Sequence, residues 1–281
     1  MVSVDILQKS GFDNLNTWSI GHENQLKDLV AKIGLPHFFV DRQIDLSVAN
    51  LTNAYNGHIP ISAIIAFSGI VLGVLTGKKD IVVSNEWSAN DPTLLVGDIP
   101  VNHQYSKSLE FEKDIQKLLK TQYGDDYRYY SLLRSLNELQ ISKIFSKSGF
   151  NKYKGVFSSC NKAFRQNEKT ISWCGECPKC CFVFLALSPF IEKEELTNVF
   201  GLNPLLNENN VEIYKELLGF TKNKPFECVG TVKESRWALE KIINDYPQLK
   251  NIYNLDFSIE LINTEATSDN IPNEIKNQLL F

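Results

Sequence analysis

Hydrophobic and polar positions in the first half of the chain follow helical and strand periods in turn. The apolar residues between Val2 and Leu7 predict a short helix, which Gly11 ends. The runs NLNTWSIG and HFFVDRQI have the β-branched and aromatic content of strands. In chain order, the pattern predicts a helix at 2–10, a strand at 14–21, a helix at 24–33, a strand at 37–44, an apolar helix at 61–77 and a strand at 80–86.

This alternation of strands and helices predicts an α/β fold with a doubly wound, mostly parallel sheet. Ligands of such sheets bind beyond the carboxyl ends of the strands, so the loops at 19–23, 56–60 and 84–90 are candidate site loops. Residues 111–147 are predicted to be mainly helical around a short strand in YYSLL, and CFVFLALSPFI predicts an apolar helix. We expect an α/β domain at 1–150, a cysteine-rich region with the following helix at 151–190, and a helical C-terminal region at 191–281.

The composition is that of an ordinary globular protein, because 43% of the 281 residues are hydrophobic and 22% are charged. The net charge of -4 and the lack of a basic stripe argue against a nucleic-acid-binding surface. The apolar run at 61–77 is shorter than the ~20 residues of a membrane-spanning helix, so we expect a buried crossover helix. The opening VSVDILQKSGF lacks the apolar centre of a signal peptide, which favours a cytoplasmic, reducing location.

The stretch WCGECPKCC holds four of the six cysteines, and Cys160 lies fourteen positions before Cys174. The C-x2-C spacing lets two sulfurs of one tight turn bind the same ion, and four thiolates saturate a tetrahedral zinc. A redox pair and incidental thiols are the alternatives. Cys181 and Cys228 are interpreted as small buried hydrophobic residues. The predicted ligands of a structural zinc ion are Cys160, Cys174, Cys177 and Cys180.

Two polar stretches, SNEWSANDP (84–92) and VNHQYSKSLEFE (101–112), follow the last predicted strand of this half. One explanation is a solvated loop that caps the next helix, but a cap needs only one such residue. A histidine, a lysine and several amides so close together suit a site that binds phosphates or carboxylates and moves protons. The stretch NGHIP, with Asn56 and His58, is predicted at the same edge of the sheet.

Taken in order, several segments closely resemble the MurL-type epimerases: NGHIPISA, IVVSNEWSAN, VNHQYSKSLEFE, SLLRSLNE, SSCN, WCGECPKCCFVFL, KPFECVG and KESRWAL. The resemblance implies an isomerase of peptidoglycan precursor synthesis, which uses ATP and magnesium to convert the terminal L-glutamate of UDP-N-acetylmuramoyl-L-alanyl-L-glutamate to D-glutamate. It also implies a sheet of the ATP-pyrophosphatase (HUP-like) type with a four-cysteine zinc knuckle. Enzymes of the ATP-pyrophosphatase type bind the phosphates of the nucleotide through an SGGxDS-like loop after the first strand. The sequence shows no such loop, so we expect it to begin after that loop and that strand.

The epimerisation that the resemblance implies gives each polar position a hypothetical role. His103 and Lys107 are the predicted proton-moving and phosphate-neutralising groups. Glu86 and Glu110 are the predicted magnesium ligands, because magnesium prefers oxygen. The predicted substrate-binding residues are Asn56, His58, Asn85, Asn102, Gln104, Ser106, Arg134, Arg165 and Arg236, with Lys162 as a further cation.

Other functions stay open at this point. The layout is more distantly similar to the 7-cyano-7-deazaguanine synthases, so another adenylating enzyme is the first alternative. A non-catalytic fragment or binding module is the second, and a cofactor-free racemase with two thiols, such as Cys181 and Cys228, is the third. The expected partner is the small UDP-muramoyl dipeptide substrate, with neither a nucleic acid nor a membrane.

Overall fold

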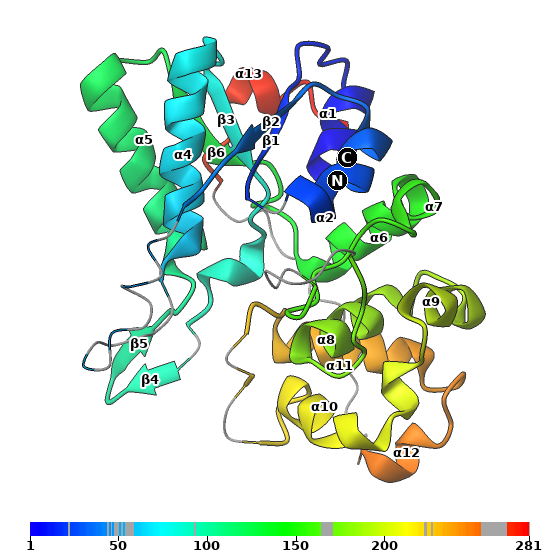
Figure 1. The fold of residues 1–281 in the computed structure, drawn as a ribbon. Coiled ribbons are helices and arrows are strands. Elements are labelled where there is room, and N and C mark those ends of the chain that lie inside the picture. Colours follow the sequence, from blue (N-terminus) through cyan, green and yellow to red (C-terminus); the bar gives the residue numbers. More distant parts are fainter. Residues whose placement is uncertain are drawn as a thin grey trace.

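The computed structural model describes residues 1–21, 23–43, 45, 47, 51, 53, 59–92, 94–163, 171–221, 224–225, 227–253 and 269–280. Strands lie in its first half, and the second half is built from helices (Figure 1). The elements of the first half are α1 (Val2–Lys9), β1 (Thr17–Ile20), α2 (Glu23–Ile33), β2 (His37–Val40), α4 (Ile61–Thr76), β3 (Asp80–Val83), η1 (Trp87–Asn90), β4 (Leu94–Val96), β5 (Ile99–Val101), η2 (Tyr105–Lys107), α5 (Leu109–Tyr123) and β6 (Arg128–Ser131).

The second half contains only helices and loops among its described residues. Asn137 begins it with a capping box, since its side chain accepts from the Gln140 N–H and the Gln140 side chain accepts from the Asn137 N–H. The elements are α6 (Glu138–Ser148), α7 (Phe150–Tyr153), α8 (Pro178–Leu187), α9 (Lys193–Phe200), η3 (Pro204–Leu206), η4 (Glu208–Asn210), α10 (Val211–Leu217), α11 (Val232–Ile242), α12 (Leu249–Ile252) and α13 (Asn273–Lys276).

The strands pair in three separate ladders. Strand β1 is parallel to β2, β3 is parallel to β6, and β4 is antiparallel to β5. The prediction of parallel strands is therefore confirmed for β1, β2, β3 and β6, but the described residues do not form the single doubly wound sheet that the pattern predicted. No described strand lies between β1 and β3 to join their ladders. The β4–β5 hairpin was not predicted, because its strands are only three residues long each.

Helices cover both faces of the β3–β6 ladder. On one face, Ile81 and Tyr129 pack with Ala66 and Ile70 of α4 and with Ile115 of α5. On the other face, Tyr130 belongs to a large core that also contains apolar residues of α1 and α6. Figure 1 shows the same order, with α4 and α5 on one side of these strands and α1 on the other. The carboxyl ends of β3 and β6 lie where the strand-containing half meets the helical half.

Helix α8 is the centre of the helical half and contacts α6, α10 and α11. The sequence predicted an apolar helix over CFVFLALSPFI (181–191), and α8 begins three residues earlier, because Pro178 occupies its first turn and Cys177 caps it by accepting from the Cys180 N–H. Phe184 and Leu185 are fully buried, as the apolar run indicated. Neither α8 nor the apolar helix α4, which has 16 residues, nor any other described helix is long and apolar enough to cross a membrane.

Candidate functional site

Arg134 joins the two polar stretches that follow β3. Its Nη1 donates to the Glu86 carbonyl at 2.8 Å, and its Nη2 donates to the Lys107 carbonyl at 2.7 Å. The guanidinium is fully buried and forms an ion pair with Glu112 at 3.0 Å. Arg134 was predicted to bind substrate, and that role stays a prediction; in the structure its guanidinium bonds the backbone at Glu86 and Lys107.

Two asparagines hold the same stretches together. The Asn102 side chain donates to the Ala89 carbonyl at 2.8 Å, and its Oδ1 accepts from the Gln104 N–H at 2.8 Å. The Asn90 Oδ1 accepts from the Leu109 N–H at 2.7 Å, at the start of α5. These hydrogen bonds hold the stretches 84–92 and 101–112 side by side.

Lys107 lies half-buried in the second of these stretches, next to several acidic groups. Burial by itself lowers the pKa of Lys107, but Cys228, Glu86 and Glu138 outweigh burial, so the pKa is raised from its ordinary value. The Cys228 side chain lies close to Lys107. The lysine is therefore held as a cation where a phosphate or carboxylate can reach it.

The carboxyl groups of Glu138 and Glu234 lie close to each other. The Glu138 N–H donates to the Glu234 Oε1 at 2.7 Å, while the Glu234 Oε2 accepts from the Thr231 N–H at 2.6 Å. Burial, with the neighbouring Glu86 and Glu234, raises the pKa of Glu138 to about 8. Burial also raises the pKa of Glu234. Glu138 therefore keeps its proton to near-neutral pH, which is the range in which an acid–base group is most useful.

Lys224 completes the set from the loop before α11. Its Nζ donates to the Val229 carbonyl at 2.9 Å. Burial lowers the pKa of Lys224, although Glu234 and Asp91 act in the opposite direction. We name the residues Glu86, Asp91, Lys107, Glu138, Lys224, Cys228 and Glu234 the junction cluster, because they come from both halves of the molecule.

Four further predicted site residues lie in the same two polar stretches as Glu86 and Lys107. Asn85 donates to the Ser131 Oγ at 3.2 Å, and Gln104 is buried. His103 and Ser106 are half-buried, His103 just before η2 and Ser106 within it. Predicted residues outside the described part of the chain are Asn56, His58 and Arg165.

Three further charged residues of the prediction interact with other parts of the molecule. Glu110 is exposed and acts on Tyr105, so its predicted pairing with Glu86 stays a prediction. Arg236 donates to the Leu218 carbonyl at 2.6 Å, at the end of α10. Lys162 pairs with Glu176 at 3.6 Å near the cysteines, and both side chains are about half exposed.

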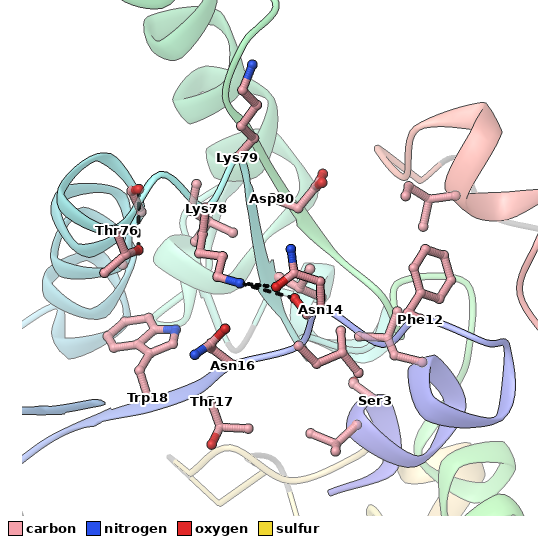
Figure 2. A pocket seen from close by; sticks show the side chains of 18 of the residues that line it. Ser3, Phe12, Asn14, Asn16, Thr17, Trp18, Thr76, Lys78, Lys79 and Asp80 are labelled. Carbon is pink, nitrogen blue, oxygen red and sulfur yellow. Dashed lines mark hydrogen bonds between the residues drawn. The ribbon is translucent and has the colours of Figure 1, made fainter. Parts of the chain in front are cut away.

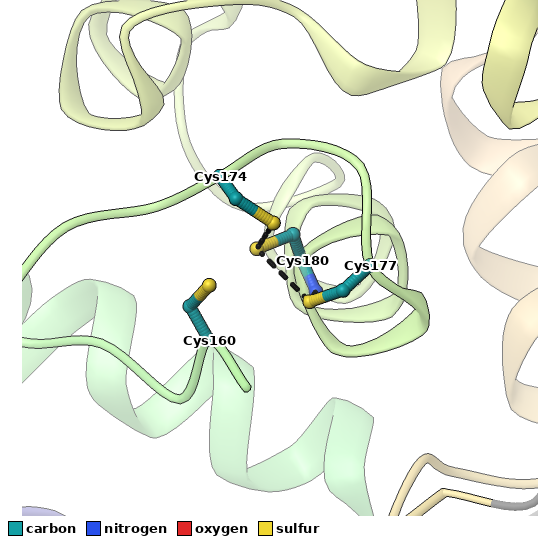
Figure 3. A group of neighbouring side chains, drawn as sticks. All are labelled: Cys160, Cys174, Cys177 and Cys180. Carbon is teal, nitrogen blue, oxygen red and sulfur yellow. Dashed lines mark hydrogen bonds between the residues drawn. The ribbon is translucent and has the colours of Figure 1, made fainter. Parts of the chain in front are cut away.

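The four predicted zinc ligands lie together (Figure 3). Their sulfur atoms are all within 4.8 Å of one another, with 3.7 Å between Cys174 and Cys180 and 3.4 Å between Cys177 and Cys180. Four sulfurs at ~2.3 Å from a tetrahedral zinc are about 3.8 Å apart, so this arrangement fits the ion. The Cys180 hydrogen bond lowers the pKa of Cys177 to about 4, which favours the thiolate that binds metal.

Three residues of the junction cluster were not singled out from the sequence: Glu138, Lys224 and Glu234. The pattern T-x-x-E at Thr231 was a possible signal for Glu234, because it is a capping box and marks a helix start. Cys181 is fully buried, as expected for a small hydrophobic residue. Cys228 is only half-buried and contacts Lys107, so the expectation for that thiol was wrong.

Comparison with known proteins matches both halves of the chain to one family. Residues 1–132 match the MurL N-terminal domain, and residues 156–270 match the MurL C-terminal domain. A UDP-N-acetyl-alpha-D-muramoyl-L-alanyl-L-glutamate epimerase of Salinispora tropica is 41% identical over 241 residues, which are 85% of this chain and 52% of that protein. A protein of the same name from Xanthomonas oryzae pv. oryzae is 40% identical over 243 residues, again 85% of this chain and 53% of its own length.

The chain spans about half the length of the curated relatives that it matches. The match nevertheless extends over both the strand-containing half and the helical half, including the four clustered cysteines and every residue of the junction cluster except Glu138. On these grounds the chain belongs to the MurL epimerase family.

Proposed function

We propose that this chain epimerises the terminal glutamate of UDP-N-acetylmuramoyl-L-alanyl-L-glutamate with the help of ATP, in peptidoglycan precursor synthesis. Support comes from relatives that are named for this epimerisation. The observation that carries the proposal within the molecule is the junction cluster, where a cationic lysine lies next to a carboxyl group with a pKa of about 8. An epimerase needs such groups to neutralise an anionic substrate and to move a proton.

Activation by ATP has a chemical reason. The α-proton of glutamate is very weakly acidic beside a free carboxylate, because the carbanion would form next to a negative charge. Adenylation of that carboxylate by ATP, which releases pyrophosphate, removes the charge and gives the developing enolate an acyl group into which it can spread. After the proton returns on the other face, water releases AMP and restores the carboxylate.

The residues of the junction cluster divide these tasks according to their charge states. Lys107 neutralises the phosphate or the enolate oxygen. Lys224, with its lowered pKa, removes the α-proton, and Glu138, with its raised pKa, supplies a proton to the other face. His103 stays a predicted proton-moving group beside η2. A magnesium ion that accompanies ATP would be held by Glu86, since a carboxylate oxygen suits that ion.

We assign the four cysteines to a structural zinc ion. A zinc saturated by four thiolates has no open position for a substrate, so it stabilises the fold and takes no part in the reaction. It joins the loop at Cys160 to the first turn of α8, where Lys179, which acts on Glu138, directly precedes Cys180. Six reduced cysteines and a nucleotide-linked substrate favour the cytoplasm as the location.

The test is proton exchange at the α-carbon. The chain is incubated with the UDP-muramoyl dipeptide, ATP and magnesium in D2O, and the terminal glutamate is then analysed by mass spectrometry and chiral chromatography. We expect D-glutamate with one deuterium at the α-carbon, and AMP as a product. Deuterium uptake without ATP would disprove the adenylation step, and no uptake under any of these conditions would disprove the epimerisation.

A further inference from the structure

The hairpin of β4 and β5 projects from the strand-containing half (Figure 1). Its ladder pairs Leu94 with Val101 and Val96 with Ile99, and the two-residue turn Gly97–Asp98 joins the strands. Among the residues that the structure describes, β4 and β5 pair with no other strand. The hairpin is therefore joined to the rest of this half through the residues at its base.

The apolar pair next to the turn faces water. Val96 and Ile99 lie opposite each other in the ladder, so their side chains are on the same face, and they are 60% and 68% exposed. In a ladder closed by a two-residue turn, the next pair directs its backbone groups outward. Pro100 belongs to that pair and has no N–H, so β5 offers no donor there to a further strand. The apolar tip is thus better suited to contact through side chains.

Two asparagines fix the base of the hairpin. The Asn90 side chain accepts from the Leu109 N–H at 2.7 Å and donates to the Trp87 carbonyl at 3.0 Å. On the other side, the Asn102 side chain donates to the Ala89 carbonyl at 2.8 Å. A paired ladder on a fixed base can turn as one unit, as the lids of many enzymes do.

The base of the hairpin adjoins the junction cluster and the helical half. Asp91, a member of the cluster, lies between Asn90 and β4. Burial raises the pKa of Asp91, while the nearby Lys224 and Lys233 of the helical half act in the opposite direction. Phe220 lies four residues before Lys224 and is 42% exposed. Four residues span at most ~14 Å and each hairpin strand is ~10 Å long, which brings Phe220 within range of the tip when the hairpin turns.

Protection from water matters at the junction cluster. The adenylated carboxylate of the proposed reaction is an acyl adenylate, which water can cleave to AMP and unchanged L-glutamate before the α-proton has exchanged. The cavity of 730 Å³ between β1 and β3 (Figure 2) is lined by other residues, among them Trp18, Lys78 and Asp80, and by no member of the cluster. Cover for the cluster therefore has to come from another element.

We propose that the β4–β5 hairpin is a lid that closes over the junction cluster when substrate is bound, with Val96 and Ile99 packing against Phe220. This inference rests on the proposed function. The closed lid keeps water from the acyl adenylate until the proton has been removed and returned. The lid then opens and admits the water that releases AMP, so that one ATP yields one exchanged α-carbon.

Closure is measured without turnover. The Val96→Trp variant is mixed with the UDP-muramoyl dipeptide, magnesium and α,β-methylene-ATP, whose bridging methylene replaces the oxygen at which adenylation cleaves ATP. The fluorescence of the parent chain with the same ligands is subtracted. We expect the difference emission to move to shorter wavelength, because the added indole leaves water. Phe220→Ser should abolish this shift.

Val71→Trp is the matched control for the probe. Val71 lies on α4 and is 58% exposed, close to the 60% of Val96, but it lies outside the hairpin. We expect its emission to stay unchanged when the three ligands bind.

A second measurement follows the products with ATP itself in D2O. Val96→Ser combined with Ile99→Ser removes the apolar tip and leaves the turn in place. We expect the number of AMP molecules released for each deuterium incorporated at the α-carbon to rise at least tenfold. Leu75→Ser, which replaces a residue of α4 that is 78% exposed, should keep the ratio of the parent chain.

Calorimetric titration with the same three ligands separates the outcomes. Binding without a shift in Val96→Trp, or an unchanged ratio of AMP to deuterium in the double variant, would overturn the lid and leave the proposed epimerisation standing. A shift in Val96→Trp without deuterium uptake by the parent chain would support closure and contradict the epimerisation. Absence of binding would overturn both.

Discussion

Arg134 and Glu112 form an ion pair that is shielded from water. The Nη2 to Oε2 distance is 3.0 Å, and the two side chains are 0% and 1% exposed. A buried pair of this kind stabilises little by itself, but the loss of one partner leaves an uncompensated charge in the interior. Since Arg134 also holds the Glu86 and Lys107 carbonyls, the pair connects the stability of the fold to the geometry of the junction cluster.

We predict that Arg134→Met lowers the free energy of unfolding by about 3–5 kcal/mol, because it leaves the Glu112 carboxylate unpaired. Urea denaturation followed by circular dichroism measures the change. Lys154→Met is the control, since its ion pair with Glu195 is 43% and 40% exposed and should contribute less than about 1 kcal/mol. The double variant Arg134→Met with Glu112→Leu should recover part of the loss. An effect of Arg134→Met as small as that of the control would contradict the prediction.

The cysteine cluster should contain one zinc ion per chain, measurable by elemental analysis of the purified protein. We expect Cys177→Ser to lose the zinc and to melt at a lower temperature, because the ion binds the folded cluster and not the unfolded chain. Cys228→Ser is the matched control, as that thiol is half-buried but lies outside the cluster, and it should retain the zinc. A zinc content unchanged in Cys177→Ser would argue against this site.

Because the pKa of Glu138 is raised, we predict that the free energy of unfolding depends on pH. Its folded pKa of about 8 is above the ordinary carboxyl value, so the folded state holds a proton that the unfolded state releases. Stability from this group is therefore fully present below about pH 4, and it decreases as the pH rises from there to about 8. Glu138→Gln should unfold with a flatter pH profile across that range. The exposed carboxylate of Glu208 provides the control, and Glu208→Gln should keep the wild-type slope.

For catalysis, we predict that Lys107→Met reduces turnover by about 10²–10³-fold, the usual effect of removing one group that stabilises developing negative charge. The rate of deuterium uptake at the α-carbon is the measurement. Lys113→Met, on the exposed side of α5, should have the wild-type rate. His103→Ala is the test of the predicted histidine, because full activity would remove it from the proton-transfer step.

The sequence determined most of the local structure of this protein. Helix α1 before Gly11, the strand at Thr17 and the helix capped at Cys177 follow from spacing, glycine positions and capping residues, which act over a few neighbours. The cysteine cluster was predictable for the same reason, since the C-x2-C turn brings sulfurs together within one loop and only Cys160 comes from farther away.

The tertiary structure alone decided the positions that depend on distant segments. In the junction cluster, Lys107 lies near Cys228 and Glu138 lies near Glu234. These residues are far apart in the sequence, and their spacing does not predict that they are neighbours. Arg134 was predicted to bind substrate because of its residue type, and only the structure shows that it is buried and bonds the Glu86 and Lys107 carbonyls. The sheet likewise depends on long-range pairing, so the pattern predicted strands correctly and could not show that β1 and β3 would leave a space between them. Hydrophobic periodicity reports which face of an element is buried, whereas the partner that covers it is chosen by packing across the whole chain.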